Sequence, residues 1–169
     1  MNTIGTFEVV SPKIMVSDPC YEKDTWCNGV VNNVKKGTWK AEVVIGTEGD
    51  WGNRVRSLVA FSKNGKPIGA WHKETFSVGV DSGQAGIYDL RFFRDNNVVK
   101  DVERVNPDNI ICEDKPWYSI NCDRTIGKFK AGVIPYGCVS SSGFGDGEYT
   151  CYTKRDKDKK VVVISIEFI

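Results

Sequence analysis

The feature that most constrains the fold of this chain is its lack of long helical periodicity. No stretch of ten or more residues repeats apolar side chains at the spacing of an α-helix. Short apolar and β-branched runs occur instead, and 17 glycines suit the tight turns between them. Because 169 residues fit one domain, we predict a single all-β domain over residues 1–169. The expected form is an antiparallel β-sandwich or partly closed barrel with at most one or two short helices.

Alternating apolar and polar residues, bounded by glycines and turn residues, give the positions of individual strands. The predicted strands are 38–45, 54–61, 68–71, 76–80, 148–154 and 159–168. The Asn64-Gly65 pair between the second and third of these predicts a hairpin, since Asn-Gly suits a two-residue turn. Residues 87–99 predict either a hairpin or a helical turn followed by a strand. A short helix is predicted over 115–125, where Pro116 suits an early helical position.

Composition and charge exclude several functional classes. The chain has 23 basic and 22 acidic residues, so it lacks the basic excess typical of proteins that bind duplex nucleic acid. No apolar run approaches the ~20 residues of a membrane helix, and the N-terminus does not resemble a secretory signal. We therefore expect a cytoplasmic protein with reduced thiols. The six cysteines, none in a Cys-x-x-Cys motif, are Cys20, Cys27, Cys112, Cys122, Cys138 and Cys151.

The first of three candidate site elements is the segment 17–21, Ser-Asp-Pro-Cys-Tyr. Pro19 holds the preceding Asp18 in an extended conformation and so restricts the direction of its carboxylate. One interpretation is an acid that contacts a ligand, with Cys20 and Tyr21 beside it. The alternative is a turn at the end of a strand, in which the carboxylate accepts backbone N–H groups.

The second element is the segment 81–86, Asp-Ser-Gly-Gln-Ala-Gly. Its glycines allow close approach of the backbone, so its amides could form a nest that binds an anion. It lacks the Lys-Ser/Thr of a phosphate-binding P-loop and does not match the dinucleotide fingerprint. The alternative is a turn in which the first residue caps the following segment. The candidate ligand-binding residues are Asp81, Ser82, Gly83, Gln84 and Gly86.

The third element is the segment 143–149, Gly-Phe-Gly-Asp-Gly-Glu-Tyr. Its candidate residues are Phe144, Gly145, Asp146 and Gly147. Asp-Gly suits a hairpin turn, but three glycines within five residues exceed what one turn needs. Asp146 and Glu148, with Asp18 and Asp81, could build an oxygen-rich cation site, yet the spacing matches no EF-hand loop. We predict neither a bound metal nor another cofactor.

The sequence does not supply a complete catalytic set. Nucleophilic catalysis by cysteine requires a base, and His72 is the only histidine. The segment 140–143, Ser-Ser-Ser-Gly, does not fit the nucleophile elbow of serine hydrolases. Trp51 lies in a Gly-rich segment, 46–53, that predicts an exposed loop and a contact surface. The other tryptophans are better explained as core or cross-strand residues than as a surface for stacking bases.

These elements resemble a bacterial and phage family known as domain of unknown function 4241. The resemblance rests on the Asp-Ser-Gly element at 81–89, the Gly-Asp-Gly element at 143–149, the final strand at 161–168 and the Asp-Pro element at 17–21. It spans about residues 14–169. Phe144 stands where the family usually has Tyr, so no role of that hydroxyl carries over. The resemblance implies a family unit and transfers no activity.

The leading hypothesis is a small non-enzymatic binding protein with a cleft formed by the three elements. A carboxylate-lined cleft favours amines, guanidinium groups or other cations, whereas exposed backbone amides favour an anion such as a nucleotide. An inhibitor of a protein partner or a sponge for a small molecule would fit this description. The alternatives are a hydrolase that uses Asp carboxylates, with or without a metal, and a purely structural or interaction protein. The oligomeric state stays open, and the relative positions of Asp18, Asp81 and Asp146 separate the hypotheses.

Overall fold

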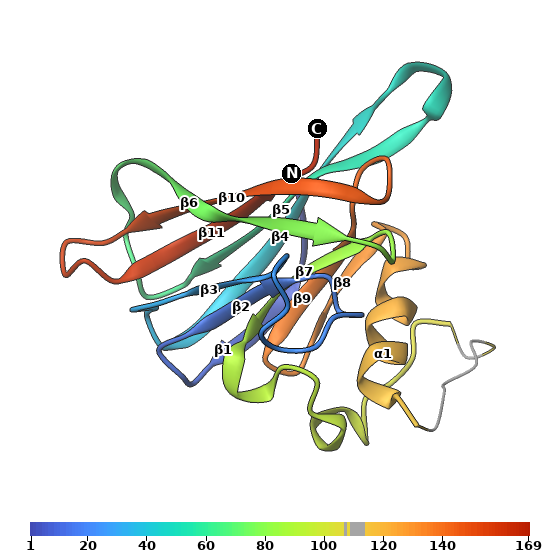
Figure 1. Ribbon diagram of the computed structural model, residues 1–169, viewed down its shortest axis with the longest axis horizontal. Helices are drawn as coiled ribbons and strands as arrows, with labels where there is room; N and C mark the ends of the chain where they lie inside the picture. Colours follow the sequence, from blue (N-terminus) through green and yellow to red (C-terminus); the bar gives the residue numbers. More distant parts are fainter. Residues whose placement is uncertain (107, 109–113) are drawn as a thin grey trace.

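Two antiparallel β-sheets form the molecule (Figure 1). The computed structural model describes residues 1–106, 108 and 114–169. The six-stranded sheet contains, in spatial order, β1 (Asn2–Val9), β4 (Gly37–Thr47), β5 (Asn53–Ser62), β11 (Val161–Glu167), β10 (Gly147–Arg155) and β6 (Ile68–Val80). The five-stranded sheet contains β3 (Gly29–Val31), β2 (Ile14–Ser17), β7 (Gln84–Asp89), β9 (Gly137–Ser141) and β8 (Ala131–Ile134). Neither sheet closes on itself within the described part of the chain, so the predicted β-sandwich is confirmed.

The main hydrophobic core lies between the two sheets. Strands of the six-stranded sheet contribute the fully buried Trp39, Leu58 and Ile164, and Ile14 and Ile87 enter from the five-stranded sheet. Burial of such side chains contributes about 1.5–3 kcal/mol each. The predicted alternation of the last strand accounts for part of this core, because alternate residues of β11 point inward.

The outer face of the five-stranded sheet is covered as well. Helix α1 (Pro116–Thr125) packs over it beside the short 3₁₀ helices η2 (Leu90–Phe92) and η3 (Asn96–Val99). A second hydrophobic cluster fills this layer, with Met15, Tyr88, Phe93, Val99, Trp117, Ile120, Ile134 and Val139 as its buried members. The predicted short helix is therefore confirmed. The region 87–99 continues β7 and then forms two 3₁₀ turns, instead of a hairpin or a turn followed by a strand.

The predicted hairpin at Asn64-Gly65 is wrong. Strand β5 pairs with β4 on one side and with β11 on the other, so neither edge is free for the strand that follows it. The chain instead crosses to the far edge of the sheet, where β6 pairs with β10. The two short strands predicted at 68–71 and 76–80 are one continuous strand, β6, of 13 residues.

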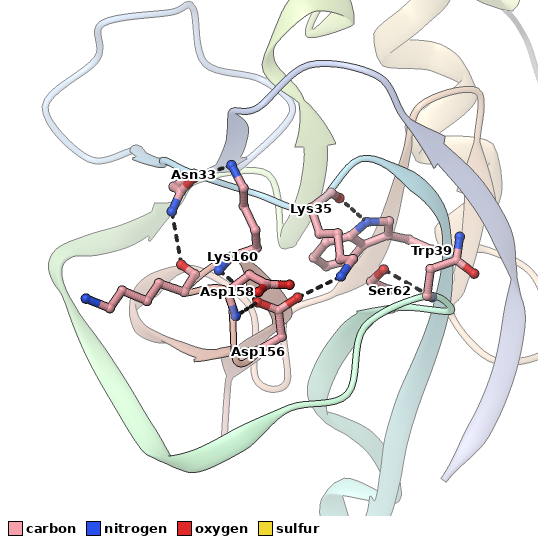
Figure 2. A network of polar contacts seen from close by, with 9 residues as sticks. Asn33, Lys35, Trp39, Ser62, Asp156, Asp158 and Lys160 are labelled. Atoms are coloured by element: carbon pink, nitrogen blue, oxygen red, sulfur yellow. Dashed lines mark hydrogen bonds and ion pairs between the residues drawn. The ribbon is translucent and has the colours of Figure 1, made fainter.

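A network of polar contacts anchors the crossing from the five-stranded to the six-stranded sheet (Figure 2). The Lys35 ammonium, between β3 and β4, contacts the buried Asp156 carboxylate in the β10–β11 turn at 2.7 Å. The Trp39 indole donates to the Lys35 carbonyl at 2.8 Å. Lys160 donates to the Asn33 side-chain oxygen at 2.7 Å, so two segments distant in sequence are joined at several points.

Candidate functional site

The first element is tied to the second through one buried carboxylate. Asp18 directly follows β2 and is completely buried. Its Oδ1 accepts from the Cys20 amide at 2.8 Å and the Ser82 hydroxyl at 2.6 Å. Its Oδ2 accepts from the amides of Asp81 at 2.9 Å and Ser82 at 2.7 Å. Three donors of Asp81 and Ser82 therefore hold the turn before β7 against the turn after β2, and the Cys20 amide closes the latter turn on itself.

The third element is tied to the second by a matching pair of contacts. The Asp146 carboxylate accepts from the Gly83 amide at 3.0 Å. In return, the Ser142 amide donates to the Gly83 carbonyl, also at 3.0 Å. Gly83 has φ +68°, in the left-handed region that favours glycine. The structure therefore brings together three elements through contacts between residues 63 positions apart in sequence.

The glycine-rich turn of the third element is braced by its own side chains. The Tyr149 hydroxyl donates to the Gly145 carbonyl at 2.6 Å and the Ser142 hydroxyl to the same carbonyl at 2.8 Å. Gly143 and Gly145 have φ of +57° and +113°, so both need the conformational freedom of glycine. Burial raises the pKa of the Tyr149 hydroxyl, which keeps it a hydrogen-bond donor to the turn.

An open pocket of about 500 Å³ lies where the three elements meet. Its lining consists of Tyr21, Trp26, Cys27, Gly79, Val80, Asp81, Asp146, Gly147 and Glu148. The carboxylates of Asp81, Asp146 and Glu148 are exposed, and within the described residues none of them forms an ion pair with Lys or Arg. The Trp26 side chain is 81% exposed at this pocket. We call it the acidic pocket.

The Tyr21 hydroxyl is held toward a carboxylate of the acidic pocket. A hydrogen bond to Asp81 is the first cause of the raised pKa of Tyr21, followed by burial and by a contact with Cys27. The raised pKa keeps the phenol neutral beside Asp81, so Tyr21 adds no negative charge to the acidic pocket. The Tyr21 amide donates to the Asp18 carbonyl at 3.3 Å, which ties the backbone of Tyr21 to the buried turn.

The Cys20 thiol has a raised pKa, whereas an activated thiol has a lowered one. Burial, a hydrogen bond with Asp18 and the negative charges of Asp18 and Asp81 raise the pKa of Cys20 to about 12, although Arg94 acts in the other direction. A reactive cysteine needs a lowered pKa, because the thiolate is the nucleophile. The geometry therefore gives no support to nucleophilic catalysis by Cys20.

Several predicted site residues lie outside the acidic pocket. Gln84 is buried, and its side-chain nitrogen donates to Cys122 Sγ of α1 at 3.3 Å. Gly86 lies inside β7, where an added Cβ would come within 2.1 Å of the Tyr88 hydroxyl oxygen, so packing explains this glycine. Phe144 is not part of the pocket lining, and its ring lies against that of Trp51. The backbone or side chains of Asp18, Cys20, Ser82, Gly83 and Gly145 shape the framework without lining the pocket.

Sequence analysis missed Trp26 as a site residue, and it did not include Glu148 among the ligand-binding residues. Trp26 was assigned with other tryptophans to a core or cross-strand position, yet it lies on an irregular segment between β2 and β3. Its neighbours Asp24, Thr25 and Asn28 are turn-forming residues, and this was the available signal for exposure. Glu148 is the second residue of β10, two residues after Asp146, and both line the acidic pocket.

The possible metal ligands and the thiols of the described residues are distributed as follows in the structure. Within residues 1–106, 108 and 114–169, no three His, Cys, Asp or Glu side chains are grouped closely enough to hold a metal ion. Asp18, considered above as a cation ligand, has both oxygens occupied by backbone and hydroxyl donors. The five cysteines in the described part of the chain are free thiols, and Cys112 lies outside it. No helix among these residues is long and apolar enough to cross a membrane.

The two-sheet architecture, with a glycine-rich junction of three turns, defines a mainly antiparallel β-sandwich protein. A family model described as "Protein of unknown function (DUF4241)" matches residues 7–166, and the chain belongs to this family. The predicted family is therefore confirmed. Searches of curated proteins and of solved structures give no match.

Proposed function

We propose that this protein is a non-enzymatic binding protein and that the acidic pocket takes a cationic group, such as a guanidinium or an amine. The observation that carries the proposal is the convergence of three exposed carboxylates beside Trp26, with no basic side chain paired to them in the described chain. The ligand is either a small cationic molecule or a basic side chain on a loop of a protein partner.

Preorganisation supports this proposal. Asp18 holds the Asp81 amide, and Asp146 holds the Gly83 amide, so the pocket backbone is fixed before any ligand arrives. Rigid sites bind more tightly because less conformational entropy is lost on binding. Among the described contacts, the Asp81 carboxylate accepts no hydrogen bond from its own backbone. Its charge is therefore not used to hold a turn and is available to a ligand in the open pocket.

Charge and aromatic character select the ligand class. Carboxylates accept charge-assisted hydrogen bonds from guanidinium or ammonium groups. An indole is the best aromatic surface for a cation, and Trp26 contributes one at the rim. Phosphates are disfavoured here, because three negative side chains would repel them. A nucleotide-type ligand therefore fits the acidic pocket less well than a basic side chain on an inhibited partner.

We expect the protein to act in the cytoplasm of a bacterium or of a phage-infected cell. The five free thiols of the described residues support a reducing compartment, and the resemblance seen in the sequence motifs is to a bacterial and phage family. A cytoplasmic site would meet its ligands at moderate ionic strength, where exposed carboxylates still attract cations at short range.

The test uses agmatine, which carries a guanidinium and an amine, and measures its affinity by isothermal titration calorimetry. We expect Trp26→Ala to weaken binding roughly threefold to thirtyfold, the range of a cation–π contact. The matched control is Trp51→Ala, which removes another exposed indole, 68% exposed, outside this pocket. Glutarate, an anion of similar length, should not bind there.

A double variant, Asp81→Asn with Glu148→Gln, tests the carboxylates. It should abolish measurable agmatine binding, while urea unfolding shows that the variant remains folded. Asp50→Asn, an exposed carboxylate on the β4–β5 turn, serves as its control. Agmatine affinity that is absent in the wild type, or unchanged in the double variant, contradicts the proposal.

A further inference from the structure

A second pocket, of about 360 Å³, differs from the acidic one in that its lining contains a basic side chain and no carboxylate. Trp51, Arg54 and Phe144 line it. Trp51 belongs to η1 (Gly49–Trp51) in the connection between β4 and β5, which projects away from the sandwich in Figure 1. Phe144 belongs to the glycine-rich turn, and Asp146, two residues later, lines the acidic pocket. We call the second pocket the arginine pocket.

The two aromatic rings form an exposed corner. Trp51 is 68% exposed and Phe144 57%, and their ring centroids lie 6.0 Å apart at an interplanar angle of 73°. Large aromatic side chains of a monomer are usually buried, and they bring much contact area at low entropic cost when they bind. Two of them, from segments about ninety residues apart in sequence, therefore make a ready surface for a flat apolar group.

Arg54 supplies the polar feature of this pocket. Its Nε is buried and has no hydrogen-bond acceptor, and its guanidinium forms no ion pair with the described residues. Arg56, two residues on, is paired with Glu48, and Arg94 is paired with Glu22. A buried donor without an acceptor is costly and rare in native structures. Arg54 lines the pocket, and none of the ion pairs of the described residues involves its guanidinium, so its charge is available to an anion entering from outside the chain.

We propose that the arginine pocket binds a planar anion, with its ring against Trp51 and Phe144 and its carboxylate or phosphate on Arg54. A guanidinium presents parallel N–H donors that match either group. The pocket lining contains no carboxylate. Lys130 donates from its ammonium to the carbonyl of Asn53, the residue before Arg54, at 3.2 Å, and so brings a second positive charge to this region.

This site is independent of the acidic pocket. The ligand classes have opposite charge, and the two linings share no residue. The exposed Trp51 loop was predicted as a contact surface, and the proposal gives its ligand class as planar anions. An aromatic carboxylate and a nucleotide both contain the required ring and anion, and the experiment separates these two sources.

The test measures binding of four probes by heteronuclear NMR of the full chain, following the Trp51 indole and Arg54 side-chain signals. The probes are 1-naphthoate, adenosine 5′-monophosphate, neutral 1-naphthamide and inorganic phosphate. We expect 1-naphthoate or the nucleotide to bind at least about tenfold more tightly than 1-naphthamide and inorganic phosphate, because neither control supplies both features. The tighter of the two ring-bearing anions identifies the source.

Variants separate the guanidinium from general charge. Arg54→Gln should weaken the better probe by at least about tenfold, whereas Arg56→Gln, on the same strand, should leave its affinity unchanged. Arg54→Lys keeps the charge without the planar fork and should give an intermediate loss. Trp51→Ala and Phe144→Ala provide a second test if Arg54→Gln does not fold. Equal binding of 1-naphthoate and 1-naphthamide, no binding of either anion, or full affinity in the Arg54 variants overturns the proposal.

Discussion

Two buried carboxylates, Asp18 and Asp156, are compensated for the loss of water by different sets of partners. Each satisfies its lone pairs with backbone amides of a turn: Asp156 Oδ1 accepts from Asp158 and Lys160, both at 3.0 Å. Asp156 also has a cation, because Lys35 lies 2.7 Å from its Oδ2 (Figure 2). Asp18 forms no ion pair within the described residues and relies on amide and hydroxyl donors alone.

The difference explains why only one of them shapes a candidate site. A cation at Asp18 would neutralise the region in which the acidic pocket opens, whereas amide donors hold the turns without adding a positive side chain. Asp18 thereby fixes the backbone of Asp81 and leaves the Asp81 carboxylate exposed. Asp156 instead stabilises the connection between β3 and β4, and the Lys35 ammonium of that connection is its partner.

The largest expected effect is that of Asp18→Asn on stability. Both oxygens of Asp18 face backbone N–H groups, so either orientation of the Asn amide places its NH₂ against a donor. Leaving buried donors unsatisfied should lower the free energy of unfolding by about 3 kcal/mol. Urea unfolding measures the loss. Asp24→Asn is the control, since Asp24 is exposed at φ +62°, a conformation that Asn tolerates; an equal loss in both variants would contradict the assigned role of Asp18.

A smaller loss of stability is expected for Asp156→Asn. Its amide oxygen can still accept from Asp158 and Lys160, while the NH₂ group faces Lys35, so the ion pair is the principal loss. The urea midpoint should fall, but by less than in Asp18→Asn. A double-mutant cycle with Lys35→Met measures the coupling between the two side chains. A coupling energy of zero would show that the contact at 2.7 Å adds no stability.

The stabilisation by Asp156 should also depend on pH. Lys35 is the first cause of the lowered pKa of Asp156, and the amides of Lys160 and Asp158 act in the same direction against the effect of burial. Because the pKa is lower in the folded state, the carboxylate stabilises the fold above its ordinary pKa of about 4 and loses this effect as the pH falls through the lowered value. The gap between the urea midpoints of wild type and Asp156→Asn should therefore narrow on acidification from pH 7. A gap that stays constant or widens would contradict this assignment.

Local rules in the sequence predicted most elements but not their pairing. The helix at 116–125 and the strands around the charged turn at 155–158 follow from Pro116 and from alternation, which are short-range signals. The hairpin at Asn64-Gly65 failed because the partner of a strand depends on which edges are free. Strand β11, about one hundred residues later, takes the second edge of β5. That competition is not visible in a local pattern.

The candidate site was predictable to a similar degree. Unusual glycine and Asp patterns marked the three elements, and the structure joins them through Asp18 and Asp146. The patterns could not separate a carboxylate that holds a turn, such as Asp18, from one that remains exposed, such as Asp81, because both precede residues with turn propensity. The same limit applies to Trp26, whose exposure depends on how an irregular segment lies against the sheets.

The smallest expected effect on stability is that of Asp146→Asn. Asp146 is exposed and accepts one amide, that of Gly83 at 3.0 Å, which an Asn oxygen can also accept. Its unfolding free energy should stay within about 0.5 kcal/mol of the wild type. Removal of its charge should still weaken agmatine binding at the acidic pocket, by a factor that shrinks as salt is added. Urea unfolding and calorimetry on the same variant measure both quantities. If Asp146→Asn instead unfolded the protein as readily as Asp18→Asn while leaving agmatine affinity intact, Asp146 would be a turn acceptor like Asp18, and the distinction between framework and pocket carboxylates would fail.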